Sequence, residues 1–245
     1  MSIVRKSFKG LPLNQALVGG LRNLSSLVNE TTFQTRPYKL FKLDSGPNSE
    51  VTVTRDEALL YYKQMQLIRR MEAACGNLYK EKKIRGFCHL STGQEACAVG
   101  SVAAMGDQDS VITSYRCHGW TYMMGATITE IISELTGRIG GNVYGKGGSM
   151  HMYTKNFFGG NGIVGAQQPL GAGIALAMKY RRQKSISLTL YGDGAANQGQ
   201  LFEGKKRISG YLQLFSAFFV TKMSATLFET FPVPDSKNFH DRDPN

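Results

Sequence analysis

The sequence predicts an α/β protein in which helices flank a parallel sheet. A helical segment at Pro169–Tyr180 precedes a nearly continuous apolar run at Ser185–Tyr191, and a glycine-rich turn, Gly192–Gly194, follows that run. A helix, a buried strand and a glycine turn in this order are typical of parallel α/β sheets. A second, short β-type run at Ser110–Tyr115 ends in a polar cluster of Tyr115, Arg116 and His118.

The first long helix is predicted to start at Thr54. Thr54 can cap its N-terminus, Asp56 and Glu57 lie in its first turn, and apolar residues recur as far as about Lys82. The preceding segment, Thr31–Val53, is polar and broken by proline and glycine, which indicates an extended arm.

Two shorter helices are predicted between the first long helix and residue 140. Gln94–Met105 is apolar on nearly all sides, which predicts a buried helix. Ile128–Leu135 has the spacing of a third helix.

Composition excludes several classes of protein. The 245 residues are 42% apolar and 19% charged, which suits a chain with a packed core. The net charge of +11 is spread as +4 over residues 1–50, +5 over 51–204 and +2 over 205–245, with no basic cluster interleaved with aromatics, so we expect no nucleic-acid binding. No apolar run reaches the roughly 18 residues of a membrane-spanning helix, so we expect no membrane insertion. The four cysteines form no CxxC pair, which indicates reduced, buried or half-buried thiols and no zinc site.

Residues 1–29 have the composition of an organelle import peptide. They contain Arg5, Lys6, Lys9 and Arg22 but no acidic residue, and leucines recur at roughly helical spacing. An ordinary terminal segment is the alternative reading. A secretory signal does not fit, because Asn14 and Gln15 interrupt the apolar stretch.

The segment Gly140–Gly165 is expected to be an ordered loop. Nine of its 26 residues are glycine, too many for regular structure, yet it also holds several aromatic residues and methionines. A flexible linker would not have this composition. The glycines therefore indicate a loop whose backbone closely approaches another group.

The turn Gly192-Asp193-Gly194 is a candidate site for a divalent cation and a phosphate group. It follows a buried strand, and ligands of open α/β sheets bind at that carboxyl edge. A carboxylate there can hold a divalent cation, and the N–H groups of Gly194 and Ala195 can face a phosphate at the start of the next helix. A plain structural loop remains the alternative on spacing alone.

Five motifs resemble the α subunits of mitochondrial pyruvate dehydrogenase, the first component of a 2-oxoacid dehydrogenase complex. They are Arg85–Leu90, Tyr115–Gly119, Gly145–Met152, Gly160–Gln167 and Gly192–Glu203, and the resemblance runs without a break from about Thr52 to Glu203. It implies a thiamine-diphosphate-binding fold with a parallel sheet flanked by helices. The branched-chain 2-oxoacid α subunits share the GDG turn, but Lys146–Met152 looks like the pyruvate type.

The resemblance also implies roles for individual residues. It assigns His89 to the substrate and Asp193 to Mg²⁺. It implies that the thiamine diphosphate is bound by a further set, which also includes Asp193: Tyr115, Arg116, Gly162, Val164, Gly194 and Ala195. A planar guanidinium such as that of Arg116 suits diphosphate oxygens, and bulk at Gly162 would block the approach of its backbone to the pyrimidine ring. His118 and His151 are interpreted as structural.

The implied partners are those of a multienzyme complex. The resemblance implies an α2β2 heterotetramer with a β subunit, which supplies a glutamate to each site. It further implies pyruvate as substrate, a lipoyl-bearing dihydrolipoyl acetyltransferase as acceptor of the acetyl group, and the mitochondrial matrix as location. The domain organisation expected is a transit peptide at 1–29, a partial cofactor-binding domain at 30–204 and a divergent tail at 205–245.

The sequence departs from the family after Glu203. The family pattern implies a metal-binding Asn near position 222, where this chain has Lys222, and no Asn occurs between Asn197 and Asn238. We therefore expect a C-terminally incomplete fold in which the strand Ser185–Tyr191 has no neighbour on one side. This leaves two readings: a pyruvate dehydrogenase α subunit, or a non-catalytic truncated product that at most binds the β subunit.

Overall fold

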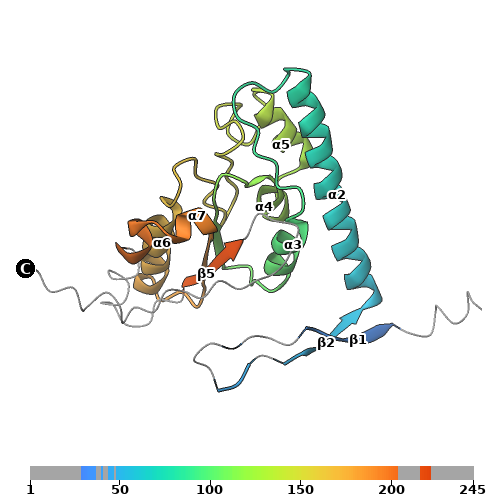
Figure 1. The fold of residues 1–245 in the computed structure, drawn as a ribbon, viewed down its shortest axis with the longest axis vertical. Helices are drawn as coiled ribbons and strands as arrows, with labels where there is room; N and C mark the ends of the chain where they lie inside the picture. Colours follow the sequence, from blue (N-terminus) through green and yellow to red (C-terminus); the bar gives the residue numbers. More distant parts are fainter. Residues whose placement is uncertain (1–28, 37–39, 41–43, 47, 204–215, 222–245) are drawn as a thin grey trace, which may run out of the picture. The chain divides into compact units, whose positions relative to one another are not determined.

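The structure is a computed structural model that describes residues 29–36, 40, 44–46, 48–203 and 216–221 (Figure 1). It divides into two compact units, residues 1–64 and residues 65–245. The predicted import peptide lies outside the described residues, as does the predicted tail except for 216–221. None of the helices within the described ranges is long and apolar enough to cross a membrane.

The first unit contains a β-hairpin rather than the extended arm predicted for Thr31–Val53. Strands β1 (Glu30–Gln34) and β2 (Glu50–Thr54) pair antiparallel, with Phe33 opposite Val51. Thr32 and Thr52 share a hydroxyl hydrogen bond of 3.0 Å on the polar face of the pair. The arm was mispredicted because its two ends, separated by a proline- and glycine-containing connection, pair with each other and satisfy their backbone groups.

Helix α2 runs from Arg55 to Lys80, close to the predicted span. Its start is fixed as expected, because Thr54 Oγ1 accepts the N–H of Glu57 at 3.3 Å and Glu57 Oε2 accepts the N–H of Thr54 at 2.9 Å. This reciprocal pair satisfies two backbone donors that a helix N-terminus otherwise leaves open.

The second unit contains a parallel sheet in the order β3-β4-β5. Its strands are β3 (Ser110–Ile112), β4 (Ser187–Gly192) and β5 (Ser216–Thr221). Ser187 is in register with Ser110 on one side and Ser216 on the other. The predicted parallel α/β architecture is therefore confirmed. The expectation that β4 lacks a neighbour on one side is wrong, because β5 pairs with its whole length and bonds that edge.

The helices of this unit are α3 (Glu95–Ala103), α4 (His118–Met123), α5 (Ile128–Leu135), α6 (Gln167–Tyr180) and α7 (Asp193–Ala196). Helix α5 has the bounds that its spacing predicts, and α6 begins two residues before the predicted start. Helix α3 is not buried on all sides, because Ala96, Gly100 and Ala103 are exposed. Small residues at these positions make the helix look uniformly apolar although only one face packs inward.

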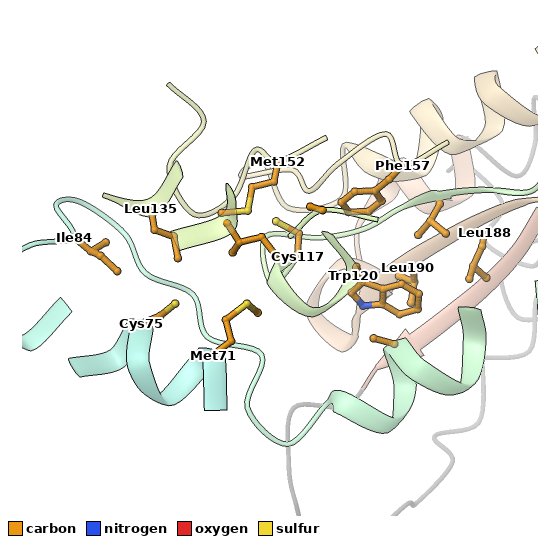
Figure 2. Packing of buried hydrophobic residues seen from close by; sticks show 14 residues of the cluster. Met71, Cys75, Ile84, Cys117, Trp120, Leu135, Met152, Phe157, Leu188 and Leu190 are labelled. Carbon is orange, nitrogen blue, oxygen red and sulfur yellow. The ribbon is translucent and has the colours of Figure 1, made fainter. Parts of the chain in front are cut away.

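The core of the second unit joins the sheet to α2, α4 and α5 (Figure 2). Leu188 and Leu190 of β4 belong to the same cluster as Trp120 of α4, Leu135 of α5 and Met71 of α2. Helix α6 packs closely against β4: a Cβ added at Gly171 would lie only 1.9 Å from Thr189 Oγ1. Glycine at this position therefore allows the helix to approach the sheet.

The four cysteines are free thiols, as predicted. Cys75 and Cys117 are fully buried in the core, and burial raises the pKa of each to about 12. Burial also raises the pKa of Cys88, to about 11, and that of Cys97. These thiols are therefore protonated and poorly nucleophilic at neutral pH.

Candidate active site

The carboxyl end of the central strand carries the GDG turn. Strand β4 ends at Gly192, and Asp193 begins the single-turn helix α7. Asp193 and Gly194 are exposed, and a Cβ added at Gly194 would meet no atom of the described residues within 4 Å. The turn therefore presents one carboxylate and open backbone at the sheet edge where ligands of α/β proteins bind.

Helix α6 holds this turn from beneath. Gln168 Nε2 donates to the carbonyl oxygen of Ala195 at 3.1 Å, and Ala195 itself is buried. Gln167 Nε2 donates to the carbonyl of Leu190, one residue before the end of the apolar run, at 3.1 Å. The buried side-chain amides of Gln167 and Gln168 thus hold the turn against helix α6. Because α7 has only four residues, its dipole adds little, and the backbone and the carboxylate are the useful groups.

His89, Tyr115 and Arg116 form a second group of predicted site residues. The ring of His89 lies 4.7 Å from that of Tyr115, tilted by 55°. The guanidinium carbon of Arg116 lies 5.4 Å from the centre of the Tyr115 ring, and its Nη1 donates to the carbonyl of Leu90. Residues 89 and 115–116, far apart in the sequence, are therefore neighbours in the fold, as the resemblance requires.

Arg116 also affects the charge of His89. Burial, followed by the positive charge of Arg116 and then the electrostatic influence of His118, lowers the pKa of His89 from its ordinary value. A lowered pKa favours the neutral ring near pH 7, which has one donor and one acceptor nitrogen. His89 is therefore suited to hydrogen bonding with a polar substrate rather than to binding an anion by charge.

The loop Gly160–Gly165 connects these two groups. At its start, a Cβ on Gly160 would lie 2.8 Å from the carbonyl oxygen of Ser114, next to Tyr115. At its end, Gly165 has a φ of +92°, and a Cβ there would lie 2.5 Å from Gln198 Oε1, just beyond α7. The loop therefore begins against the Tyr115–Arg116 segment and ends against the segment that follows the GDG turn.

The middle of this loop holds Gly162 and Val164. Val164 is 42% exposed. A Cβ at Gly162 would come within 3.2 Å of Met150 Cε and 3.4 Å of His151 Cε1, and its N–H donates to His151 Nε2 at 3.4 Å. A side chain at this position would therefore press on Met150 and His151, besides blocking the approach of a pyrimidine ring that the resemblance implies.

The donor chemistry of the site fits a magnesium–diphosphate pair better than a protein cage for a metal. No group of three or more His, Cys, Asp or Glu side chains that could hold a metal occurs in the part of the chain that the structure describes. Mg²⁺ typically takes one or two carboxylates and completes its shell with phosphate oxygens and water. The exposed carboxylate of Asp193 beside open backbone meets that requirement. Position 222, where the family pattern implies an Asn ligand, lies outside the described residues.

Two further residues of this region were not predicted. Phe87 is 67% exposed and stacks on His89, with ring centres 5.5 Å apart and an interplanar angle of 11°. Ser149 Oγ accepts the backbone N–H of His89 at 2.9 Å. The two-residue spacing of Phe87 and His89 was visible in the sequence, whereas the contact with Ser149 spans 60 residues and has no local signal.

His118, interpreted as structural, is fully buried and lies within hydrogen-bond distance of Glu72 and Ser149.

The region that carries these residues matches a known family. The model of the family described as dehydrogenase E1 component matches residues 63–214. The chain belongs to the dehydrogenase E1 component family. Every predicted site residue, from His89 to Ala195, lies inside the matched range, and the hairpin of the first unit precedes it.

Relatives of this E1 component chain are similar over most of its length. It is 74% identical over 174 residues to a probable pyruvate dehydrogenase E1 component subunit alpha, mitochondrial, of Caenorhabditis elegans, which covers 71% of this chain and 44% of the relative. It is 64% identical over 196 residues to a pyruvate dehydrogenase E1 component subunit alpha type II, mitochondrial, of Ascaris suum. That alignment covers 80% of this chain and 50% of the relative. It is 56% identical over 192 residues to the pyruvate dehydrogenase E1 component subunit alpha, somatic form, mitochondrial, of Homo sapiens. That alignment covers 78% of this chain and 48% of the relative.

The E1 component chain thus spans about half the length of the curated relatives that it matches. The family match over residues 63–214 includes both groups of site residues and the loop that connects them. The similarity therefore falls on the part of the fold that builds the candidate site.

Proposed function

We propose that the chain is the α subunit of a thiamine-diphosphate-dependent pyruvate dehydrogenase, which decarboxylates pyruvate and passes the acetyl group to a lipoyl group. The observation that carries the proposal is the loop Gly160–Gly165, which runs from the Tyr115–Arg116 segment to the segment after the GDG turn. A diphosphate, its metal and an attached ring need contacts at several points, and this loop links them. The names of the relatives support pyruvate as the substrate.

In this proposal both groups of site residues hold the diphosphate with its metal, and the loop between them holds the pyrimidine ring. Asp193 binds the Mg²⁺ that neutralises the diphosphate, and the backbone of Gly194 and Ala195 contacts diphosphate oxygens. Tyr115 and Arg116 contact the diphosphate from the other side, where the guanidinium supplies paired donors. Gly162 and Val164 offer backbone groups to the pyrimidine ring.

His89 is proposed to contact the substrate. Its ring lies between Phe87 and Tyr115, and its lowered pKa keeps it neutral near pH 7. A neutral imidazole can donate a hydrogen bond to the carbonyl or carboxylate oxygen of a 2-oxoacid. When bound, thiamine diphosphate supplies the electron sink that the decarboxylation needs.

Partners and location follow the same proposal. The relatives are named as alpha subunits of an E1 component and as mitochondrial. We propose a β subunit in an α2β2 assembly, a lipoyl-bearing dihydrolipoyl acetyltransferase as acceptor, and the mitochondrial matrix as location. The basic, acid-free residues 1–29 support import into that compartment.

A cofactor titration tests the proposal. The chain is co-expressed with a β subunit, and thiamine diphosphate is titrated at saturating Mg²⁺ by calorimetry. We expect saturable binding that Asp193→Asn weakens by at least about a hundredfold, because the metal loses an anionic ligand. Arg116→Lys keeps the charge but loses the paired geometry, so its effect is smaller.

The matched control is Asp107→Asn, which removes an exposed carboxylate between α3 and β3. It should bind the cofactor as the parent does. Absence of binding by the unsubstituted complex would overturn the proposed function. Equal binding by the parent and Asp193→Asn would show that the cofactor site is placed wrongly.

A further inference from the structure

A chain of buried polar side chains lies directly behind His89. Glu72 Oε1 and Oε2 lie 3.0 and 3.1 Å from His118 Nδ1, and His118 Nε2 lies 3.0 Å from Ser149 Oγ. Ser149 Oγ also accepts the backbone N–H of His89 at 2.9 Å. The three side chains come from α2, α4 and the glycine-rich loop, and all three residues are buried.

For a neutral His118 ring, its partners define the direction of these hydrogen bonds. A carboxylate only accepts, so Nδ1 carries the hydrogen that Glu72 receives. In the neutral ring Nε2 is then an acceptor, and it takes the O–H of Ser149. A lone pair of Ser149 Oγ remains for the N–H of His89, and Ser91 Oγ donates to Glu72 Oε1 at 2.9 Å. In this arrangement each hydrogen of the network has an acceptor, which favours one rigid geometry.

The order Glu–His–Ser is that of a hydrolytic triad, but the surroundings exclude a nucleophilic serine. Ser149 is only 3% exposed, so no acyl group can reach its hydroxyl. The oxygen already receives the N–H of His89. A nucleophile needs an open approach, and buried Ser149 has none.

We propose that Ser149 is a positioning residue for His89, an inference that rests on the proposed function for the role of His89 itself. The backbone around His89 is anchored twice: Ser149 holds its N–H, and Arg116 holds the carbonyl of the next residue, Leu90. These two anchors orient the imidazole between Phe87 and Tyr115. His118 and Glu72 act through Ser149 by fixing its hydroxyl.

Two NMR readouts test the inference without any cofactor. In the unsubstituted chain the amide of His89 should exchange slowly with solvent, and its imidazole signals should be shifted by the rings of Phe87 and Tyr115. Ser149→Ala should raise the exchange rate of this amide by about tenfold, the effect of losing one hydrogen bond of ordinary strength. The imidazole signals should also move toward those of a free histidine.

The matched control is Ser91→Ala. Ser91 is as deeply buried as Ser149 and bonds the same carboxylate of Glu72, but has no bond to His89. It should leave both His89 readouts unchanged, whereas Ser149→Thr, which keeps the hydroxyl, should restore slow exchange. If Ser149→Ala fails to fold, the exchange rate of the His89 amide in Ser149→Thr and in the unsubstituted chain still tests the inference.

Fast exchange of the His89 amide in the unsubstituted chain would overturn the inference. Equal changes in Ser91→Ala and Ser149→Ala would also overturn it, because the effect would then be general loosening of the core. Neither readout involves thiamine diphosphate, so failure here is distinct from failure of the titration of Asp193→Asn.

Discussion

The carboxylate of Glu134 accepts the backbone N–H of Gly147 at 2.6 Å. It also accepts the N–H groups of Val143 and Gly145, at 2.8 and 3.0 Å, so one buried side chain binds three donors of the glycine-rich loop. A Cβ at Gly147 would lie 1.8 Å from the carbonyl oxygen of His151. The glycines predicted to permit a close approach therefore allow the loop to fold around a carboxylate of its own chain.

The first prediction is that Glu134→Gln destabilises the fold by about 2 kcal/mol, because one of the two accepting oxygens becomes an NH₂ group that faces backbone donors. Urea unfolding followed by circular dichroism measures the change. Glu130→Gln is the control on the same helix. Glu130 belongs to an exposed capping box, which glutamine also completes, so its change should stay within about 0.5 kcal/mol. Equal losses in the two variants would contradict the role of Glu134.

The second prediction concerns two glycines of α6. Gly171→Ala should cost about 1–3 kcal/mol, because the new methyl overlaps Thr189, a buried β-branched residue that cannot move aside. Gly173→Ala should be neutral or stabilise by up to about 1 kcal/mol, because a Cβ there meets no atom in the part of the chain that the structure describes and alanine favours the helix. The difference in melting temperature between the two variants is the measurement. A stable Gly171→Ala variant would show that α6 does not lie this close to β4.

The third prediction is that Arg116→Gln raises the pKa of His89, measured by NMR titration of the imidazole. The rise should be partial, because burial, the larger cause of the lowered pKa, remains. Arg138→Gln, which removes an exposed charge elsewhere, should leave this pKa unchanged.

The sign of the associated stability change follows from linkage. Because the folded pKa of His89 is lowered, the unfolded chain binds the proton more readily, and stability from this group falls as the pH drops below about 6.5. Arg116→Gln should therefore lessen the loss of stability in acid that is due to His89. An unchanged pKa of His89 would mean that the two groups are farther apart than the structure places them.

The fourth prediction concerns the ion pair of Arg69 with Glu95, in which Nη2 and Oε2 lie 3.0 Å apart. Burial pushes the pKa of Glu95 upward, but the hydrogen bonds from Arg69 and Gly93 outweigh it and lower that pKa. This stability is present above the unfolded pKa and is lost as the pH falls through the folded value. Glu95→Gln should lower the free energy of unfolding by about 1 kcal/mol near neutral pH, because the side chain of Arg69 is half exposed. The loss should become smaller as the pH falls below 4.5.

Denaturant unfolding between neutral and acidic pH checks this dependence. Glu81→Gln is the control, because Glu81 pairs with Lys83 at 2.8 Å but both side chains are exposed. Glu81→Gln should leave the free energy of unfolding nearly unchanged at every pH. A cost of Glu95→Gln that does not change with pH would show that the carboxylate is not stabilised in its charged form.

The sequence predicted the elements whose signals are local. The apolar spacing predicted α5, which the structure caps with Thr127, and the continuous apolar run predicted β4. Helix α4 was missed because His118–Met123 combines a glycine with aromatic residues and has no capping side chain. Strand β5 was missed as a partner of β4, because nothing near Ser216 indicates which strand it joins. Parallel pairing is decided by contacts that are distant in the sequence.

The candidate site shows the same division. Asp193 could be placed at a strand end from the residues around it, and the resemblance supplied the neighbours His89, Tyr115 and Arg116. The support behind His89 could not be predicted, since Glu72, His118 and Ser149 meet only when three separate segments pack together.

The raised pKa of each of the four thiols makes the chain a convenient host for a single chemical label. A thiol with a pKa of about 11 is ionised in only about one molecule in ten thousand at neutral pH, and the thiolate is the form that reacts with maleimides and iodoacetamide. A cysteine introduced at Gly173, where a side chain meets no neighbour, would be exposed and would ionise normally. A fluorophore could therefore be attached to α6 selectively, without first removing any of the native cysteines.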